Sequence, residues 1–364
     1  MALPIHIREI EITNYKSFDH LTASDFGQIN LITGKNNAGK TTFLEALYLC
    51  LGPANPALWL GVSGRRGLDR YSPDQPNYDY LFTNLETDSP IQFKIRTEQK
   101  NDFELQLEIV IPTSFDIESA SDSDAPTSTN NGAEQETETF DPKVARIRQI
   151  YTPSDGQPLE THTTMFAGKI RSGGNRERIF KNSVYLGHTA GTQDQNAPQR
   201  YSDLDKAEQI AAFEPTLRII APHLKRTSLA INNDQTLIHA DVGYGLVPVS
   251  TLGSGIARMT SLLLAIPSSE DAIVLIDEME TSFHHSSLED IWKAVAESAR
   301  RFNSQVFATT HSHELIVAAH SAFEADREVD FRLHKLTRRD GKVEFHSFGR
   351  KNLKAAIETG LELR

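Results

Sequence analysis

Cysteine pairs and long hydrophobic runs are missing from this sequence. Its 364 residues include one cysteine, Cys50, which excludes an internal disulfide and any multi-cysteine zinc site. The longest apolar runs, such as residues 262–266, are far shorter than the roughly 20 residues that cross a bilayer. The first residues also lack the charged and apolar regions of a signal peptide. These absences predict a soluble, cytoplasmic protein.

The sequence also has no excess of positive charge. Lys and Arg number 37 against 49 Asp and Glu, and the net charge of −12 excludes a globally basic nucleic-acid coat. Residues 116–141 hold eight acids and no base, within a stretch at 112–142 that has almost no apolar side chain. Because such a segment cannot bury enough surface to offset its ordering entropy, we expect residues 112–142 to be a disordered acidic insertion. Strand patterns at 91–111 and 144–151 place it in a loop of a sheet.

The rest of the chain alternates strand and helix patterns, which indicates an α/β fold. Short apolar runs at 29–33, 272–276 and 305–309 are typical of strands buried in a parallel sheet. Alternating apolar residues over 91–111 predict a β-hairpin with one wet face. Further elements are expected as a strand with one register slip at 5–12, helices at 41–51, 202–224, 256–266 and 286–302 (the last with a capping box of Ser286 and Glu289), a hairpin at 228–242, a strand at 331–336 and a terminal helix.

The strongest chemical signal is the turn at residues 34–41, which reads Gly-Lys-Asn-Asn-Ala-Gly-Lys-Thr. It matches the P-loop pattern at every fixed position, and it lies between an apolar strand and an amphipathic helix. Backbone N–H groups of such a loop close around phosphate oxygens, while Lys40 is expected to reach the β- and γ-phosphates and Thr41 to ligate Mg²⁺. The nucleotide-binding residues expected here are Gly34, Asn36, Asn37, Ala38, Gly39, Lys40, Thr41 and Thr42.

Two acids and a histidine follow two of the predicted buried strands. Asp277 and Glu278 come directly after residues 272–276, at the strand end where ligands bind in parallel sheets. We expect Asp277 to hold Mg²⁺ through water and Glu278 to orient or deprotonate the attacking water. The strand at 305–309 delivers His311 to the same edge, where its imidazole could hydrogen-bond a γ-phosphate oxygen or that water. The sequence therefore predicts Glu278 and His311 as catalytic residues, and Thr41 and Asp277 as metal ligands.

A second glycine-rich turn, Leu252-Gly253-Ser254-Gly255, opens the helix expected at 256–266. A helix N-terminus of this kind binds anions. Contact with the nucleotide of its own chain would duplicate the P-loop, so we expect Gly253, Ser254 and Gly255 to face the nucleotide of a second copy.

The order of these motifs resembles the ABC-type ATPase heads of the SMC, RecF and OLD group, and most of all the compact OLD-like ATPases of prokaryotic phage-defence loci. Residues 10–18 are similar to the family's first strand and its aromatic–basic–Ser–Phe turn, which adds Lys16 to the expected nucleotide-binding residues. The resemblance covers nearly the whole chain except residues 112–142. It implies one head at residues 1–364, with a parallel core sheet, an antiparallel β lobe and a helical signature lobe.

The same resemblance implies a function. It implies a Mg²⁺-dependent ATPase that dimerises, or forms a higher oligomer, around ATP. Binding or hydrolysis would then control a separate effector, such as a nuclease, in phage defence or DNA repair and maintenance.

Some features depart from the family pattern. The signature usually reads Leu-Ser-Gly-Gly, so the serine hydroxyl of its second position is missing here, although Ser254 could substitute. No heptad run long enough for coiled-coil arms is present, and the 53 residues after His311 are too few for a Toprim nuclease domain. A nuclease would therefore be a separate chain. Gln75 and Gln92 are both weak candidates for the Q-loop glutamine.

Two alternative functions stay open. One is an ATP-gated scaffold with negligible turnover, and the other is a repair-type ATPase that binds nucleic acid. The second would use the basic stretch 169–181, which is otherwise a solvated loop. His284, His285, His311 and His313 could be zinc ligands, but the resemblance places His284 just after the Asp277-Glu278 pair and His311 at the switch of the nucleotide site. Turnover rate and its stimulation by DNA distinguish these functions.

Overall fold

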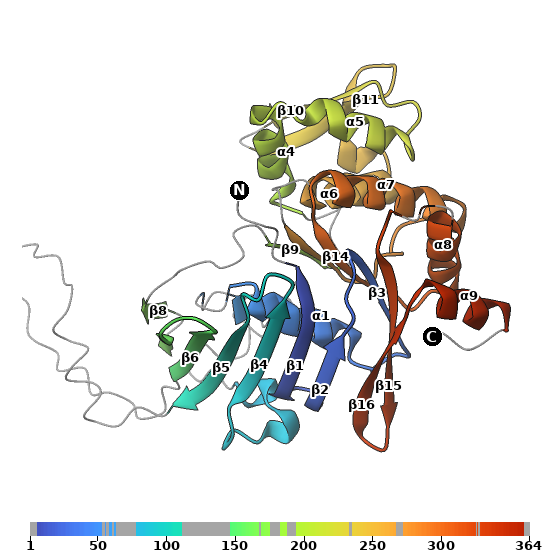
Figure 1. The fold of residues 1–364 in the computed structure, drawn as a ribbon. Helices are drawn as coiled ribbons and strands as arrows, with labels where there is room; N and C mark the ends of the chain where they lie inside the picture. The colour runs from blue at the N-terminus through green and yellow to red at the C-terminus, as the bar shows by residue number, and fades with distance from the viewer. Residues whose placement is uncertain are drawn as a thin grey trace, which may run out of the picture.

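The computed structural model describes all residues except 1–5, 53–54, 56–57, 60–61, 63–77, 111–145, 167–168, 175–182, 188–193, 233–234, 267–271, 325, 327 and 360–364. Two large sheets enclose helix α1, and a third group of elements lies at the top of the view in Figure 1. Within the described part of the chain, no helix has the length and apolarity needed to span a membrane.

A six-stranded sheet carries the predicted motifs. Its strand order is β16-β15-β3-β14-β13-β9, in which the strands from β15 to β9 are parallel and β16 pairs antiparallel with β15. Every residue of β3, β13 and β14 is buried, which confirms the interpretation of their apolar runs. The strands are β3 (Ile29–Thr33), β9 (Ser183–Leu186), β13 (Ile273–Ile276), β14 (Gln305–Thr309), β15 (Phe331–Arg339) and β16 (Lys342–Phe348).

A seven-stranded antiparallel sheet, in the order β2-β1-β4-β5-β6-β7-β8, forms the expected β lobe. The register of β1 shifts between Ile7 and Glu9, as the slip in the sequence pattern predicted. Strands β5 and β6 pair up to Val110 opposite Arg146, and the acidic stretch 112–142 between them lies outside the described residues. The strands are β1 (Ile7–Tyr15), β2 (Phe18–Ser24), β4 (Ile91–Thr97), β5 (Phe103–Val110), β6 (Arg146–Pro153), β7 (Leu159–Phe166) and β8 (Lys169–Gly174).

Helix α1 (Lys40–Cys50) fills the space between the two sheets (Figure 1). Phe43 and Leu47 of this helix belong to one buried cluster with Phe93 of the antiparallel sheet and Phe307 of the core sheet. Cys50 is fully buried at the end of the helix, and burial raises the pKa of its thiol, so it is an unreactive core residue. The helix that follows the P-loop is thus held by both sheets.

The lobe at the top of Figure 1 contains the second glycine-rich turn. It consists of helices and a three-stranded sheet in the order β10-β11-β12. The predicted hairpin around residues 232–234 is confirmed as β10 and β11. The elements are α4 (Ala197–Lys206), α5 (Ile210–Arg218), β10 (Arg226–Asn232), β11 (Gln235–Asp241), β12 (Leu246–Pro248) and α6 (Ser254–Ala265).

Three further helices cover the face of the core sheet opposite α1. Trp292 and Phe323 pack in one cluster with Val274 and Val306 of the sheet, and the Trp292 indole donates to the Leu315 carbonyl at 3.1 Å. The helices are α7 (Leu288–Arg301), α8 (His313–Glu324) and α9 (Arg350–Glu358). The predicted helix at 286–302 and the terminal helix are confirmed.

Three local expectations were wrong. The helix expected over 202–224 is two helices, because Glu208 adopts a left-handed φ of 58° between α4 and α5. The basic stretch 169–181 begins as strand β8 rather than as a loop, and residues 175–182 lie outside the described part.

The third wrong expectation is the capping box at the start of α7, which does not form. Ser286 lies in a 3₁₀ turn (His285–Ser287), where its backbone N–H donates to the His284 ring. Glu289 instead bonds Lys293 at 2.7 Å and Ser321 at 2.9 Å. The spacing of a capping box was present, but the helix starts later than that spacing requires.

Candidate nucleotide-binding site

The P-loop is an open turn between β3 and α1 with three residues at positive φ. They are Gly34 at 150°, Asn37 at 63° and Gly39 at 100°. Glycine is required at two of them: a Cβ on Gly34 would lie 2.5 Å from the Leu336 carbonyl of β15, and one on Gly39 would lie 2.8 Å from the Phe18 ring. Strand β15 and the turn after β1 therefore confine the loop from two sides.

The Lys40 ammonium curls back over the loop. Its Nζ donates to the carbonyls of Gly34 at 2.7 Å and Lys35 at 3.1 Å. Burial lowers the pKa of Lys40, and the negative charges of Glu280, Asp277 and Glu278 oppose that shift. The ammonium thus lies at the mouth of the loop, in the field of three acids, where it could meet a phosphate.

Thr41 and Asp277 are far apart in the sequence but lie side by side in the structure. The Thr41 hydroxyl lies 3.2 and 3.1 Å from the two carboxylate oxygens of Asp277. A second hydroxyl, that of Thr309 at the end of β14, donates to Asp277 Oδ1 at 2.6 Å and accepts from the Glu278 N–H at 2.9 Å. A hydroxyl beside a carboxylate supplies the hard oxygen ligands that Mg²⁺ prefers.

Glu278 differs from Asp277 in its surroundings. Asp277 is buried, whereas Glu278 is partly exposed and has a left-handed φ of 48°. Non-glycine residues rarely adopt this conformation, and it occurs often at functional sites. The chain turns away from the direction of the strand immediately after Asp277. The side chain of Asp277 is therefore buried, whereas that of Glu278 is partly exposed to solvent.

His311 lies in the loop after β14 and is held by an acid that the sequence reasoning did not assign. Its backbone N–H donates to Glu280 Oε1 at 2.9 Å, and its Nδ1 lies 3.1 Å from the same oxygen. Glu280 belongs to the loop after β13. The predicted catalytic residues Glu278 and His311 are therefore carried by two adjacent loops of the same sheet edge.

Lys16 is placed differently from the phosphate contact implied by the resemblance. Its backbone has a positive φ of 50°, and its Nζ forms an ion pair of 2.8 Å with Glu45 of α1. Both side chains are at least nine-tenths buried. In this structure Lys16 fastens the turn after β1 to the helix that follows the P-loop.

The signature turn is open to solvent. Gly253 has a φ of 113°, and a Cβ added there would have open space within 4 Å. Ser254 and Gly255 border solvent at the start of α6. A Cβ on Gly255 would lie 3.0 Å from the Ser282 carbonyl, so the turn touches the loop after β13. Among the described residues, none of its backbone N–H groups donates to the backbone of the P-loop in the same chain.

Arg258 links the signature helix to the site, a role for which the sequence offered only its position after the turn. Its guanidinium is buried and donates to the carbonyls of Gly187, Asp277 (2.9 Å) and Glu278 (3.4 Å). Burial lowers the pKa of this arginine, while nearby acids oppose the shift. Thus α6 is tied to the ends of both β9 and β13.

Two other predicted sites are less well supported. Gln92 lies within strand β4, opposite Gln106, and Gln75 lies outside the described residues, so no Q-loop glutamine is identified. The centroids of the His284 and His285 rings lie 4.0 Å apart, yet no cluster of three or more metal-ligating side chains occurs in the described part of the chain.

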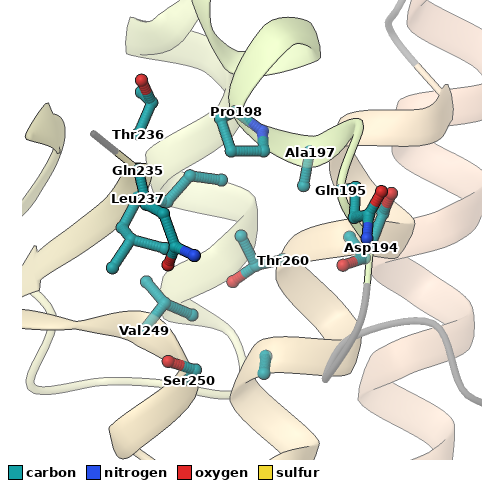
Figure 2. A pocket seen from close by; sticks show the side chains of 13 residues that line it. Asp194, Gln195, Ala197, Pro198, Gln235, Thr236, Leu237, Val249, Ser250 and Thr260 are labelled. Atoms are coloured by element: carbon teal, nitrogen blue, oxygen red, sulfur yellow. The ribbon is translucent and has the colours of Figure 1, made fainter. Parts of the chain in front are cut away.

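A separate cavity of about 590 Å³ lies within the signature lobe. Figure 2 shows Ala197 and Pro198 of α4, Leu237 of β11 and Thr260 of α6 around it. None of its lining residues belongs to the P-loop, to the acid-bearing loop after β13 or to the His311 loop after β14.

Comparison with known proteins identifies the family. A family model described as "AAA domain, putative AbiEii toxin, Type IV TA system" matches residues 29–318. The chain belongs to this family. The match runs from β3 into α8, so the matched region includes the P-loop, the signature turn, the acid-bearing loop after β13 and the His311 loop after β14.

A curated relative over most of the chain is described by a nucleotide-hydrolysing activity. An "ATP/GTP phosphatase" of Helicobacter pylori is 23% identical over 326 residues, which cover 85% of this chain and 86% of that protein. The DNA replication and repair protein RecF of Oceanobacillus iheyensis is 44% identical over a short stretch of 45 residues, 12% of each chain. The chain is an ATP-hydrolysing P-loop ATPase, as the sequence predicted.

Solved structures support the fold. An SmcHead bound to the C-winged helix domain of ScpA matches with a TM-score of 0.53 at 13% identity, covering 97% of this chain and 99% of that one. The Pyrococcus furiosus Smc head bound to the C-terminal domain of ScpA matches with a TM-score of 0.52 at 11% identity, covering 98% and 99%. These matches confirm the expected fold, that of an ABC-type ATPase head.

Proposed function

We propose that this ATPase binds Mg²⁺ and ATP at the P-loop and that Glu278 acts on the attacking water. The observation that carries the proposal is the approach of the Thr41 hydroxyl to the Asp277 carboxylate, at 3.1 and 3.2 Å. It joins the first turn of α1 to the end of β13, so a phosphate-binding loop and a carboxylate share one location. Gly34, Asn36, Asn37, Ala38, Gly39 and Thr42 complete the proposed phosphate-binding loop.

The residues present fit a magnesium ion. Thr41 and Asp277 would hold it, with Asp277 acting through water, because hydroxyl and carboxylate oxygens match the preference of Mg²⁺. When bound, the ion would neutralise negative charge on the phosphates. Lys40 would exchange its two loop carbonyls for phosphate oxygens, which are stronger acceptors because they carry charge.

We further propose that the site is completed by a second copy of the chain. The turn at Gly253, Ser254 and Gly255 borders solvent, and the P-loop covers only one side of a triphosphate. The γ-phosphate develops charge in the transition state and needs donors on its open side. A helix N-terminus from a partner copy would supply them.

The proposed output of the cycle is control of a separate effector protein, such as a nuclease, in phage defence or DNA maintenance. ATP binding would hold two copies together, and hydrolysis would release them. Two solved heads of the same fold were obtained with domains of ScpA, which supports partner binding by heads of this kind.

The Glu278→Gln variant tests the site. It removes the carboxylate that acts on water but keeps the shape of the side chain, so hydrolysis should fall by roughly 10²-fold or more while ATP affinity is retained. Lys40→Ala should weaken ATP binding itself. Steady-state turnover and calorimetric ATP titration measure the two effects separately.

The matched control is Glu344→Gln, which removes the charge of an exposed acid on β16. It should leave both turnover and affinity unchanged. Hydrolysis at the wild-type rate by Glu278→Gln would contradict the assignment.

A further inference from the structure

Glu280 and His311 form a pair at the edge of the proposed site. Glu280 Oε1 accepts from the His311 backbone N–H at 2.9 Å and lies 3.1 Å from His311 Nδ1. The Glu280 side chain is 13% exposed, whereas the His311 side chain is 53% exposed. The carboxylate of Glu280 is therefore the more buried member of the pair, and the imidazole of His311 extends from it toward solvent.

The chemistry of the pair dictates which ring nitrogen carries the proton. An ionised carboxylate only accepts hydrogen bonds, and its oxygen lies 3.1 Å from Nδ1, so this contact favours the proton on Nδ1. In the neutral imidazole the lone pair then lies on Nε2, because the bond made by one nitrogen sets the state of the other. Nε2 is left as an acceptor at the exposed end of the ring.

We propose that Glu280 is a positioning residue that holds His311 in the Nδ1–H form, so that Nε2 can accept a hydrogen bond from the attacking water. The backbone hydrogen bond and the contact of Nδ1 converge on one oxygen, which places both the loop after β14 and the ring against Glu280. The inference rests on the proposed role of His311 in the ATPase site.

A competing role for Glu280 must be separated from this one. Its other oxygen, Oε2, is buried without a hydrogen-bond partner among the described residues. Its charge is also the largest of the three that oppose the lowering of the Lys40 pKa. Glu280 could thus act on Lys40 alone, in which case the state of the His311 ring would not depend on it.

Nuclear magnetic resonance of the imidazole distinguishes the two roles without any turnover. In protein labelled at histidine with ¹⁵N and ¹³C, at about pH 8 where an ordinary imidazole is neutral, His311 should show the Nδ1–H pattern. Glu280→Ala should shift it toward the Nε2–H form. Glu280→Gln should keep it, because the two His311 donors select the amide oxygen as their acceptor.

The matched control is Glu344→Ala, which removes another carboxylate that contacts a histidine, His346 at 3.3 Å. This variant should leave the His311 signals unchanged. If the Glu280→Ala variant does not fold, the Glu280→Asp variant is used in its place. Aspartate is one methylene shorter, so its carboxylate lies farther from the His311 ring. An unchanged His311 pattern in the folded variant would overturn the proposal.

Kinetics supply the second arm of the test. Glu280→Ala should lower kcat for ATP by roughly tenfold with KM within about twofold, and Glu280→Gln should restore most of the rate. In a His311→Ala background, Glu280→Ala should cause no further loss, since residues that act as a unit are not additive. Additive losses would assign Glu280 to Lys40 instead.

The spectroscopic and the kinetic experiments can contradict the proposal independently of each other. If His311→Ala leaves kcat unchanged, the proposed role of His311 is wrong and the catalytic part of this inference falls with it. The ring pattern would still show whether Glu280 fixes the protonated nitrogen.

Discussion

Thr309 is a residue whose importance appears only in the folded chain. Its hydroxyl donates to Asp277 at 2.6 Å and accepts from the backbone of Glu278 at 2.9 Å, so it contacts both acids of the proposed site. It is fully buried. One small side chain thus aligns the proposed metal ligand with the residue that follows it.

Thr309→Val tests this alignment. Valine keeps the shape but leaves the Glu278 N–H without its acceptor, which costs about 1–3 kcal/mol of unfolding free energy. The loss of the bond to Asp277 should also lower turnover by roughly tenfold, because the carboxylate is no longer fixed. Urea unfolding and steady-state hydrolysis measure the two effects.

Thr309→Ser is the matched control, since it retains the hydroxyl. It should recover most of the lost turnover. Equal activity of the valine variant and the wild type would show that Asp277 is aligned without Thr309.

At the scale of elements, His334 connects three strands of the core sheet. It lies on β15, its Nε2 is 3.1 Å from Asn30 Oδ1 of β3, and its Nδ1 is 2.9 Å from Ser347 Oγ of β16. The ring stacks on Phe345 with centroids 4.9 Å apart. Complete burial lowers the pKa of His334 to about 3, and the charge of Arg332 acts in the same direction.

This burial predicts a loss of stability in acid. An unfolded histidine titrates near pH 6.5, so below that value the unfolded chain binds a proton that the folded chain refuses. Stability contributed by neutral His334 is therefore present above about pH 6.5 and is lost as the pH falls toward 3. From pH 7 to pH 5 the loss should be about 2 kcal/mol.

Comparison of wild type with His334→Gln isolates this contribution. Glutamine does not titrate and can still donate to Asn30, so its unfolding free energy should depend less on pH over that interval. Urea unfolding at the two pH values gives the difference. Identical pH dependence in the two proteins would assign the acid sensitivity to other groups.

Much of the core sheet could be predicted, because β3, β13 and β14 are fully buried and read as continuous apolar runs. The P-loop and the adjacent acids could be predicted for a similar reason, since local spacing defines them. Thr309 could not. Its role depends on the pairing of Ile276 with Ala308, which brings the ends of β13 and β14 side by side.

Other features depended on contacts that no local pattern reveals. Lys16 forms an ion pair with Glu45 of α1, 29 residues along the chain, and its expected contact with the nucleotide stays a prediction. The break between α4 and α5 depends on the left-handed turn at Glu208, a residue type that usually continues a helix. Tertiary context decided both cases.

At the scale of the whole molecule, the signature turn and the acid-bearing loop after β13 are tied into one unit. Gly255 packs against the Ser282 carbonyl, and Arg258 bonds the backbone of Asp277 and Glu278. In the proposed dimer this unit would face the partner's nucleotide while carrying acids for its own. The two sites would therefore be mechanically coupled through each chain.

Mixing two inactive variants tests the dimer. Gly253→Glu should leave ATP binding to an isolated chain nearly intact but abolish turnover, because its carboxylate would repel the γ-phosphate. Lys40→Ala should be inactive through loss of binding. Their mixture should recover part of the activity, since one composite site then has an intact P-loop and an intact signature turn.

Gly245→Glu is the matched control. This glycine has a φ of 122° and open surroundings like those of Gly253, but it lies between β11 and β12. The Gly245→Glu variant should hydrolyse ATP at the wild-type rate. The mixed dimer should be verified by co-purification, because rescue requires exchange of subunits. A verified mixed dimer without activity, together with a wild-type specific activity that is independent of concentration down to a demonstrated monomer, would argue that each chain works alone.

The pairing of Val110 with Arg146 has a consequence for how this protein can be altered. The two residues are cross-strand neighbours, so the chain leaves and rejoins the sheet at adjacent positions. The entropy of closing such an excursion grows only with the logarithm of its length, by about 0.6 kcal/mol for each doubling. A fluorescent reporter or an affinity tag inserted between Val110 and Arg146 should therefore lower the stability of the ATPase only slightly.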